Sequence, residues 1–254
     1  CVKWLYTKKA MGFNNRHWQI KSYLANFIIT INDEMRAYFP NKKEQKLIPL
    51  GIDTNYYSPI HFEKEKTNAD EVFQIITVAN LVPVKGIEIL IKAVHHLQDR
   101  SIQLIILGDN NNDYGQEMMH LVKQLKMCTQ VQFIGKQLDV RPFIAEADLY
   151  VIPTLDEGRK EGMPMALVEA MTMGIPVLGS NISGIRYVLK DFPNLLFSSA
   201  DAYSLANKIK SIYNLSSEEQ QKLGSNLRDY CIKHFSMETF IKKHEDLYLK
   251  LVKQ

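Results

Sequence analysis

Cysteine is scarce in this sequence, and its three residues are too widely spaced for a metal or disulfide pattern. Cys1, Cys128 and Cys231 form no CxxC pair, which is the spacing typical of structural zinc sites. A secreted disulfide framework would need a denser and even set of cysteines. We therefore expect no metal site and a cytoplasmic location, where thiols stay reduced.

Long apolar runs and a strong excess of one charge are also missing. The longest apolar run, at residues 24–31, is interrupted by Asn26 and is far shorter than the roughly 20 residues that span a bilayer. The formal net charge is only +3, which does not predict nucleic-acid binding. It is compatible with weak contact with anionic lipids at the inner face of a membrane.

Several motifs of catalysis and nucleotide binding are absent. The sequence contains neither GxGxxG nor GxxxxGK, the glycine-rich loops that hold dinucleotides and triphosphates. No GxSxG elbow surrounds Ser180 or Ser183, which argues against a serine hydrolase of that type. His95 and His96 lack a third ligand nearby, so a solvated helix face explains them better than a metal site does.

Short apolar runs alternate with amphipathic stretches from about Glu71 onward. This alternation predicts an α/β fold, with a Rossmann-like parallel sheet and helices on both faces. We predict strands at 72–79, 102–107, 131–134, 149–153, 176–179 and 195–197. We predict helices at 86–97, 114–127, 141–147, 164–173, 202–213, 218–235 and 237–252.

The segment 156–170 (DEGRKEGMPMALVEA) carries the clearest indication of a site. Proline is favoured in a first helical turn, so Pro164 predicts a helix start. The free amides of Met165, Ala166 and Leu167 would then attract an anion such as phosphate. The loop follows a predicted strand, so it lies at the carboxyl edge of the sheet, where ligands bind in such folds.

Other candidates lie around that edge, and each has a simpler alternative. Glu161, before Gly162, and Glu169 flank the predicted anion site, although both carboxylates could equally belong to an ordinary surface. Lys85 follows the first predicted strand and could place its charge on a diphosphate, or it could simply be solvated. Gly135 could let the backbone approach a flat base, or it could form a tight turn.

These segments, in this order, resemble the retaining family 4 glycosyltransferases of the GT-B fold. The family's KG loop, F-x-G turn and E-x7-E motif correspond to Lys85-Gly86, Phe133-Ile134-Gly135 and Glu161 to Glu169. Three further segments are also similar to family signatures: 47–53 (LIPLGID), 152–158 (IPTLDEG) and 169–180 (EAMTMGIPVLGS). The resemblance covers roughly residues 25 to 254.

The resemblance implies a nucleotide-sugar donor, such as a UDP- or GDP-sugar, and no metal or other cofactor. Lys85, Gly162 and the amides of Met165, Ala166 and Leu167 would hold the diphosphate. Glu161 would face the sugar, and Glu169 would bind the ribose. Backbone near Gly135 and Lys136 would meet the base. The sugar would pass, with retention, to a glycan or lipid-linked acceptor in polysaccharide or glycolipid biosynthesis.

The sequence departs from the family pattern at one position of the site. Many members carry an arginine five residues before the lysine, and this chain has Asn80 there. Asparagine can hydrogen-bond an oxygen but brings no charge. We hypothesise that Arg159 or Lys160, which precede Glu161, partly compensates.

The chain also appears shorter than a complete enzyme, as its start at Cys1 suggests. We expect 1–50 to be a remnant of an N-terminal acceptor domain with a linker, too small to bury a core alone. Residues 51–236 would bind the donor. The helix in 237–254 would pack back toward the N-terminal domain, with its apolar stripe partly exposed.

We therefore expect little transferase activity from this chain alone, and two other functions stay open. It could be a nucleotide-binding module without transferase activity. It could also be a sugar-nucleotide epimerase of similar fold, although the EGMPMALVEAM segment argues against that.

Overall fold

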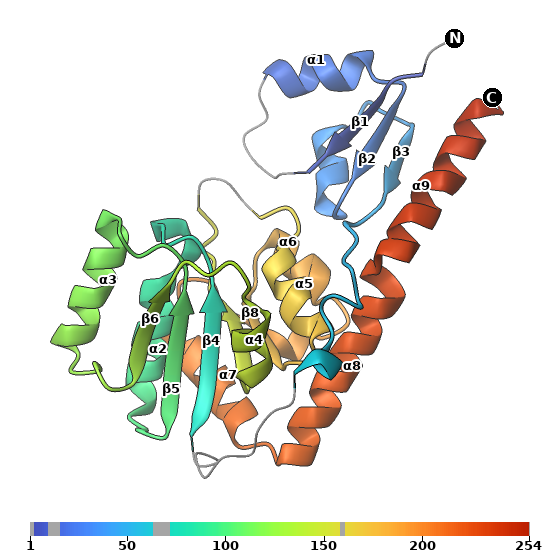
Figure 1. The fold of residues 1–254 in the computed structure, drawn as a ribbon. Coiled ribbons are helices and arrows are strands. Elements are labelled where there is room, and N and C mark those ends of the chain that lie inside the picture. Colours follow the sequence, from blue (N-terminus) through green and yellow to red (C-terminus); the bar gives the residue numbers. More distant parts are fainter. Residues whose placement is uncertain (1–2, 10–15, 63–71, 158–160, 254) are drawn as a thin grey trace.

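The larger part of the molecule is built on a six-stranded parallel sheet, as the sequence predicts. The computed structural model describes residues 3–9, 16–62, 72–157 and 161–253 (Figure 1). The sheet order is β6-β5-β4-β7-β8-β9. Its strands are β4 (Phe73–Val78), β5 (Ile102–Leu107), β6 (Val131–Gly135), β7 (Leu149–Ile152), β8 (Val177–Ser180) and β9 (Leu196–Phe197).

This strand order reverses direction between β4 and β7. The chain runs from β4 outward to β6, crosses back to β7, and then continues outward to β9. β4 and β7 pair in parallel, with Ile75 opposite Leu149. Because neighbouring loops diverge where the order reverses, a crevice forms at the carboxyl ends of these two strands.

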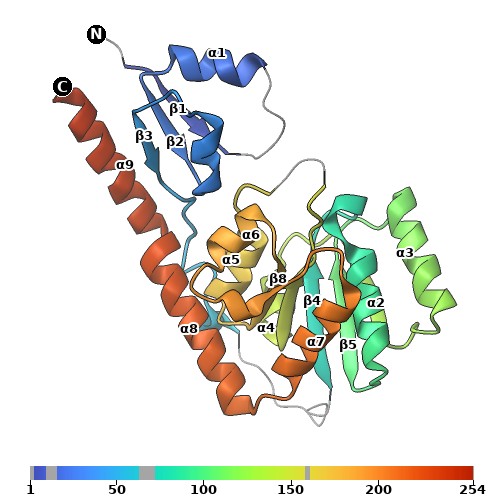
Figure 2. The same ribbon diagram turned by 180° about the vertical axis from the view of Figure 1, so that it is seen from behind.

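Helices cover both faces of this sheet, which confirms the predicted fold class. α2 (Ile87–Leu97) and α7 (Ala202–Tyr213) pack together on one face, and α4 (Arg141–Glu146) lies on the other (Figures 1 and 2). The remaining helices of this part are α3 (Asp113–Gln124), α5 (Met165–Thr172), α6 (Ser183–Val188) and α8 (Ser217–Phe235). The prediction did not include α6, a helix of six residues.

The N-terminal part contains a second parallel sheet, which the sequence did not predict. The strands β1 (Leu5–Lys8), β2 (Phe27–Thr30) and β3 (Gln45–Leu47) pair in the order β1-β2-β3. The helix α1 (Arg16–Leu24) and the 3-10 helix η1 (Glu34–Tyr38) lie between them along the chain. β1 and β3 are too short, and too mixed in polarity, to stand out in the sequence.

The C-terminal helix α9 (Met237–Val252) lies along the small sheet in both views (Figures 1 and 2). Leu247 and Leu251 join Phe27, Ile29 and Ile48 in a separate apolar core. Leu249, in the same stripe of the sequence, is exposed. Among the described residues, no helix is both long and apolar enough to cross a bilayer.

Candidate functional site

A cavity of about 140 Å³ opens at the reversal point between β4 and β7. Its walls come from the ends of these strands and from the loops that follow them. The lining residues are Thr77, Val78, Ala79, Lys85, Ile152, Pro153, Thr154, Glu161, Pro164, Met165 and Ala166. The structure thus brings together Lys85, Glu161, Met165 and Ala166, four of the residues that the sequence singled out.

Lys85 reaches this cavity because its loop packs tightly against the loop after β7. It ends the 3-10 helix η3 (Pro83–Lys85), and Gly86 follows with a φ of 65°. A Cβ atom at Gly86 would lie 2.1 Å from the carbonyl oxygen of Pro153. The amide of Leu155 donates to the carbonyl of Val84 at 2.8 Å, which joins the two loops. Glycine after the lysine is therefore required by both conformation and space.

Glu161 faces Lys85, and the two side chains form an ion pair. Their side chains are only 21% and 26% exposed, so the pair is partly withdrawn from water. The next carbonyl, that of Gly162, accepts a 2.6 Å hydrogen bond from the buried side chain of Asn32. A Cβ atom on Gly184 would meet the Glu161 carbonyl at 2.5 Å. The backbone that carries Glu161 is thus held from two sides.

Helix α5 begins one residue later than predicted, and one of the three amides predicted to be free is bonded within the chain. Pro164 is the cap residue, with a ψ of 100°, and Met165 begins the helix. Leu167 was expected to offer a free amide, but its N–H donates to the Pro164 carbonyl at 3.1 Å and its side chain is buried. The helix start therefore turns Met165 and Ala166 toward the cavity, whereas Leu167 belongs to the core.

Glu169 lies further along α5 and does not line the cavity. Burial raises its pKa, and a hydrogen bond from the Tyr57 hydroxyl partly opposes that rise. Burial and the nearby Glu169 carboxylate raise the pKa of Tyr57 to about 12. The tyrosine therefore remains a neutral donor to this carboxylate at physiological pH. Sequence reasoning did not find Tyr57, because its partner is more than a hundred residues away.

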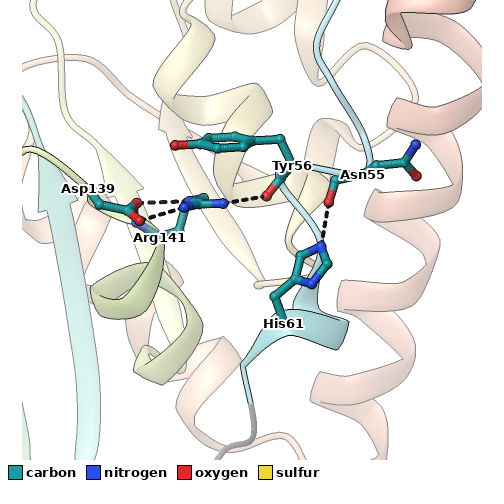
Figure 3. Close-up of polar contacts among 5 residues, drawn as sticks. All are labelled: Asn55, Tyr56, His61, Asp139 and Arg141. Carbon is teal, nitrogen blue, oxygen red and sulfur yellow. Dashed lines mark hydrogen bonds and ion pairs between the residues drawn. The ribbon is translucent and has the colours of Figure 1, made fainter.

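Two arginines hold the segment that carries Tyr57 against the rest of the fold. Arg141 forms hydrogen bonds of 2.6 and 2.9 Å with the Asp139 carboxylate, and it donates to the Tyr56 carbonyl at 3.1 Å (Figure 3). Its guanidinium carbon also lies 3.6 Å from the centre of the Tyr56 ring. Arg228 donates to the Tyr57 carbonyl at 3.0 Å and also bonds the carbonyl of Thr172, on α5. These contacts set the position of Tyr57 relative to α5.

Other predicted site residues lie away from the cavity. Gly135 ends β6, one of the two edge strands of the sheet, with a φ of 78°. It accepts a 3.1 Å hydrogen bond from the Gly108 amide. Lys136, next to it, is exposed. Asn80 is also exposed and is outside the cavity lining. Arg159 and Lys160 fall outside the described residues, so their predicted role stays a prediction.

The arrangement around the cavity is suited to an anion. It combines one ammonium group with the first amides of a helix, which lack partners within the helix and carry partial positive charge. The Glu161 carboxylate supplies an acceptor beside them. Within the described part of the chain, no group of three or more His, Cys, Asp or Glu side chains could hold a metal ion.

A family model and several curated proteins match this chain. Residues 60–230 match the family model described as "Glycosyl transferases group 1". The amylovoran biosynthesis glycosyltransferase AmsK of Erwinia amylovora is 27% identical over 176 residues, covering 64% of this chain and 43% of that protein. The N-acetyl-alpha-D-glucosaminyl L-malate synthase of Bacillus anthracis is 26% identical over 236 residues, covering 88% and 58%.

A solved structure shows the same fold at low sequence identity. The crystal structure of Anabaena Alr3699/HepE in complex with UDP and glucose has a TM-score of 0.80 and 20% identity, covering 97% of this chain and 71% of that one. The chain spans about half the length of the curated relatives it matches.

Proposed function

Because this chain belongs to the glycosyl transferases group 1 family, we propose that its cavity binds the diphosphate of a nucleotide-sugar donor. The observation that carries the proposal is that Lys85, Glu161 and the first residues of α5 line one cavity at the sheet's reversal point. The complex of HepE with UDP and glucose supports a UDP-sugar as the first donor to test, with a GDP-sugar as the other candidate.

In the proposed reaction, the bond between the anomeric carbon and the diphosphate breaks while an acceptor hydroxyl attacks the same face. The acceptor oxygen bonds the anomeric carbon, its proton passes to the departing phosphate, and configuration is retained. Negative charge grows on the leaving group, where Lys85 and the amides of Met165 and Ala166 stabilise it. Glu161 holds sugar hydroxyls and stabilises positive charge at the anomeric carbon. The reaction written this way uses no metal or other cofactor.

The remaining residues are proposed to bind the rest of the donor. Glu169, oriented by Tyr57, accepts hydrogen bonds from the ribose hydroxyls. Backbone near Gly135 and Lys136 meets the base, and Gly162 contributes backbone to the diphosphate site. Arg159 supplies positive charge for the diphosphate, which the uncharged side chain of Asn80 does not bring.

For the whole protein, we propose transfer to a glycan or lipid-linked acceptor in polysaccharide or glycolipid biosynthesis. The name of AmsK, an amylovoran biosynthesis glycosyltransferase, supports this pathway class. The proposed location is the cytoplasm, with contact at the inner face of the membrane. The 254-residue chain alone is expected to bind donor without appreciable transfer, so binding is the proper test.

Calorimetric titration of this chain with UDP, GDP and ADP tests the donor site. We expect saturable binding of at least one nucleotide by the wild type. Lys85→Ala should weaken that binding roughly 10- to 100-fold, the usual effect of losing a hydrogen bond to a charged group. The matched control is Lys92→Ala, because Lys92 pairs with Glu88 on α2 and does not line the cavity.

Two results would count against the site. Folded wild-type protein that binds none of the three nucleotides would refute the proposed function. Equal weakening by Lys85→Ala and Lys92→Ala would mean that general charge, rather than the cavity, attracts the nucleotide.

A further inference from the structure

One residue that lines the cavity carries a buried hydroxyl without a hydrogen-bond partner in the described part of the chain. Thr154 follows β7, lines the cavity, and is only 1% exposed. Its Oγ1 atom has no partner among the residues that the structure describes. Buried polar groups are nearly always paired, and leaving one unpaired costs stability. An orphaned hydroxyl on a residue that lines the same cavity as Lys85 and Glu161 therefore points to a ligand that supplies the missing partner.

The backbone around Thr154 is fixed, so the side chain has little freedom to find another partner. Its carbonyl accepts a 2.5 Å hydrogen bond from the Ser180 hydroxyl on β8. On one side, the Pro153 carbonyl packs against Gly86. On the other, the Leu155 amide bonds the Val84 carbonyl. The same contacts that place Lys85 thus also place Thr154.

We propose that Thr154 is a further donor-binding residue, whose hydroxyl donates a hydrogen bond to a phosphate oxygen of the diphosphate. This inference rests on the proposed function of the cavity. A hydroxyl can donate to an anionic oxygen without adding charge, and hydrogen bonds to charged groups are stronger than neutral ones. The Glu161 carboxylate at the cavity is paired with Lys85, and no acceptor of the described residues bonds the Thr154 hydroxyl. The diphosphate is therefore the acceptor that this hydroxyl fits.

The test compares Thr154→Val, which removes the hydroxyl but keeps the shape, with Thr154→Ser, which keeps the hydroxyl. Each variant and the wild type are titrated with UDP, GDP and ADP at one fixed salt concentration. Thr154→Val should weaken the tightest of these nucleotides by roughly tenfold. Thr154→Ser should bind close to the wild-type affinity.

A ligand-free measurement tests the orphaned hydroxyl directly. Replacing an unpaired buried hydroxyl by a methyl group of similar volume should raise the urea midpoint of unfolding. The matched control is Thr172→Val, because the Thr172 hydroxyl is buried but donates to the Val168 carbonyl at 2.6 Å. That control should lower the midpoint. A residue with a purely structural role would not combine higher stability with weaker nucleotide binding.

The outcomes separate this inference from the proposed function. If the wild type binds a nucleotide and Thr154→Val binds it equally well, the role of Thr154 is refuted while the donor site stands. A fall in the midpoint as large as that of Thr172→Val would show that the hydroxyl already has a partner, and would also refute the inference. If the folded wild type binds no nucleotide, the proposed function fails and this role falls with it, even where the midpoint rises.

Discussion

At the scale of single residues, the two carboxylates of the E-x7-E motif occupy different environments. Glu161 stands in the loop before α5 and pairs with the ammonium group of Lys85. Glu169 lies within α5, where burial raises its pKa and only the Tyr57 hydroxyl opposes the rise. One carboxylate is thus paired with a charge, and the other is held at a cost in stability. Such a cost is typical of a group kept for binding rather than for folding.

This difference predicts how stability depends on pH. The folded pKa of Glu169 is raised above its ordinary value of 4.5, so its contribution to stability is complete below that value and is lost as pH rises through the folded pKa. The wild type should therefore lose stability relative to Glu169→Gln between acid and neutral pH. The loss is about 1.4 kcal/mol for each unit by which the folded pKa exceeds the unfolded one.

Urea unfolding of both proteins at a series of pH values measures this difference. Glu245→Gln is the control, because Glu245 is an exposed carboxylate on α9, and its curve should run parallel to that of the wild type. A Glu169→Gln curve that also ran parallel would mean that burial does not perturb this carboxylate.

At the scale of elements, the helix that carries Glu169 is positioned by a close crossing with α8. Gly174, with a φ of 74°, follows the end of α5. Gly224 lies in the middle of α8 and is buried. A Cβ atom at Gly224 would lie 1.9 Å from the Gly174 carbonyl oxygen. The absence of a side chain here lets the two helices approach.

Gly224→Ala therefore sets helix propensity against packing. In an exposed helix, alanine would stabilise by about 1 kcal/mol relative to glycine. At this crossing the added methyl must push backbone apart, and we expect a net loss of about 1 to 3 kcal/mol in the free energy of unfolding. Urea denaturation measures it. Ser225→Ala, exposed on the same helix, should instead be neutral or slightly stabilising. Stabilisation by both variants would show that α5 and α8 do not pack so closely.

At the scale of the whole molecule, several contacts join the small sheet and its connecting segments to the rest of the chain. Ile31 and Met35 belong to the larger core, and three further contacts stand out. Asn32, which follows β2, bonds the Gly162 carbonyl beside Glu161. Glu34 pairs with Arg186 on α6 at 2.9 Å. The third contact is α9, which buries Leu247 against the small sheet. The first contact means that a shift of the small sheet would be transmitted to the loop that carries Glu161.

The apolar contact of α9 is expected to contribute to holding the small sheet, beside Ile31 and Met35, which join the larger core. Leu247 is 1% exposed and Leu249 is 61% exposed. Leu247→Ala should therefore cost about 2 to 5 kcal/mol of local stability, and Leu249→Ala should cost little. Hydrogen exchange followed by mass spectrometry should show faster exchange in β1–β3 for Leu247→Ala, with β4, β5 and β7 unchanged. Equal exchange in both variants would mean that other contacts hold the small sheet.

The sequence was most informative where a pattern repeats locally. The bounds of β5, α7 and α9 agree with the prediction residue for residue. A capping box of Ser216 and Glu219 starts α8, and its S-x-x-E pattern can be read in four consecutive residues. The small sheet was missed because its strands are short and their partners come from distant parts of the chain.

Local sequence placed Lys85, Glu161, Met165 and Ala166 in or beside strand-end loops, and the structure brings them to one cavity. Their role in binding stays a prediction. Local sequence could not separate Leu167 from these residues, since only the backbone geometry shows that its amide bonds Pro164. Nor could it find Thr154, Tyr57 or Asn32. Their significance depends on a missing partner or on one far along the chain.

By itself, the sequence determined the α/β alternation, most of the helices, and the loops in which the cavity residues lie, because periodicity, caps and turns act over a few neighbouring residues. Only the tertiary structure decided which loops meet, that the Leu167 amide bonds Pro164, and that the Thr154 hydroxyl lacks a partner among the described residues. Those outcomes depend on close approaches, such as Gly86 against Pro153 and Asn32 against Gly162. Such approaches form only when segments distant in the chain pack together.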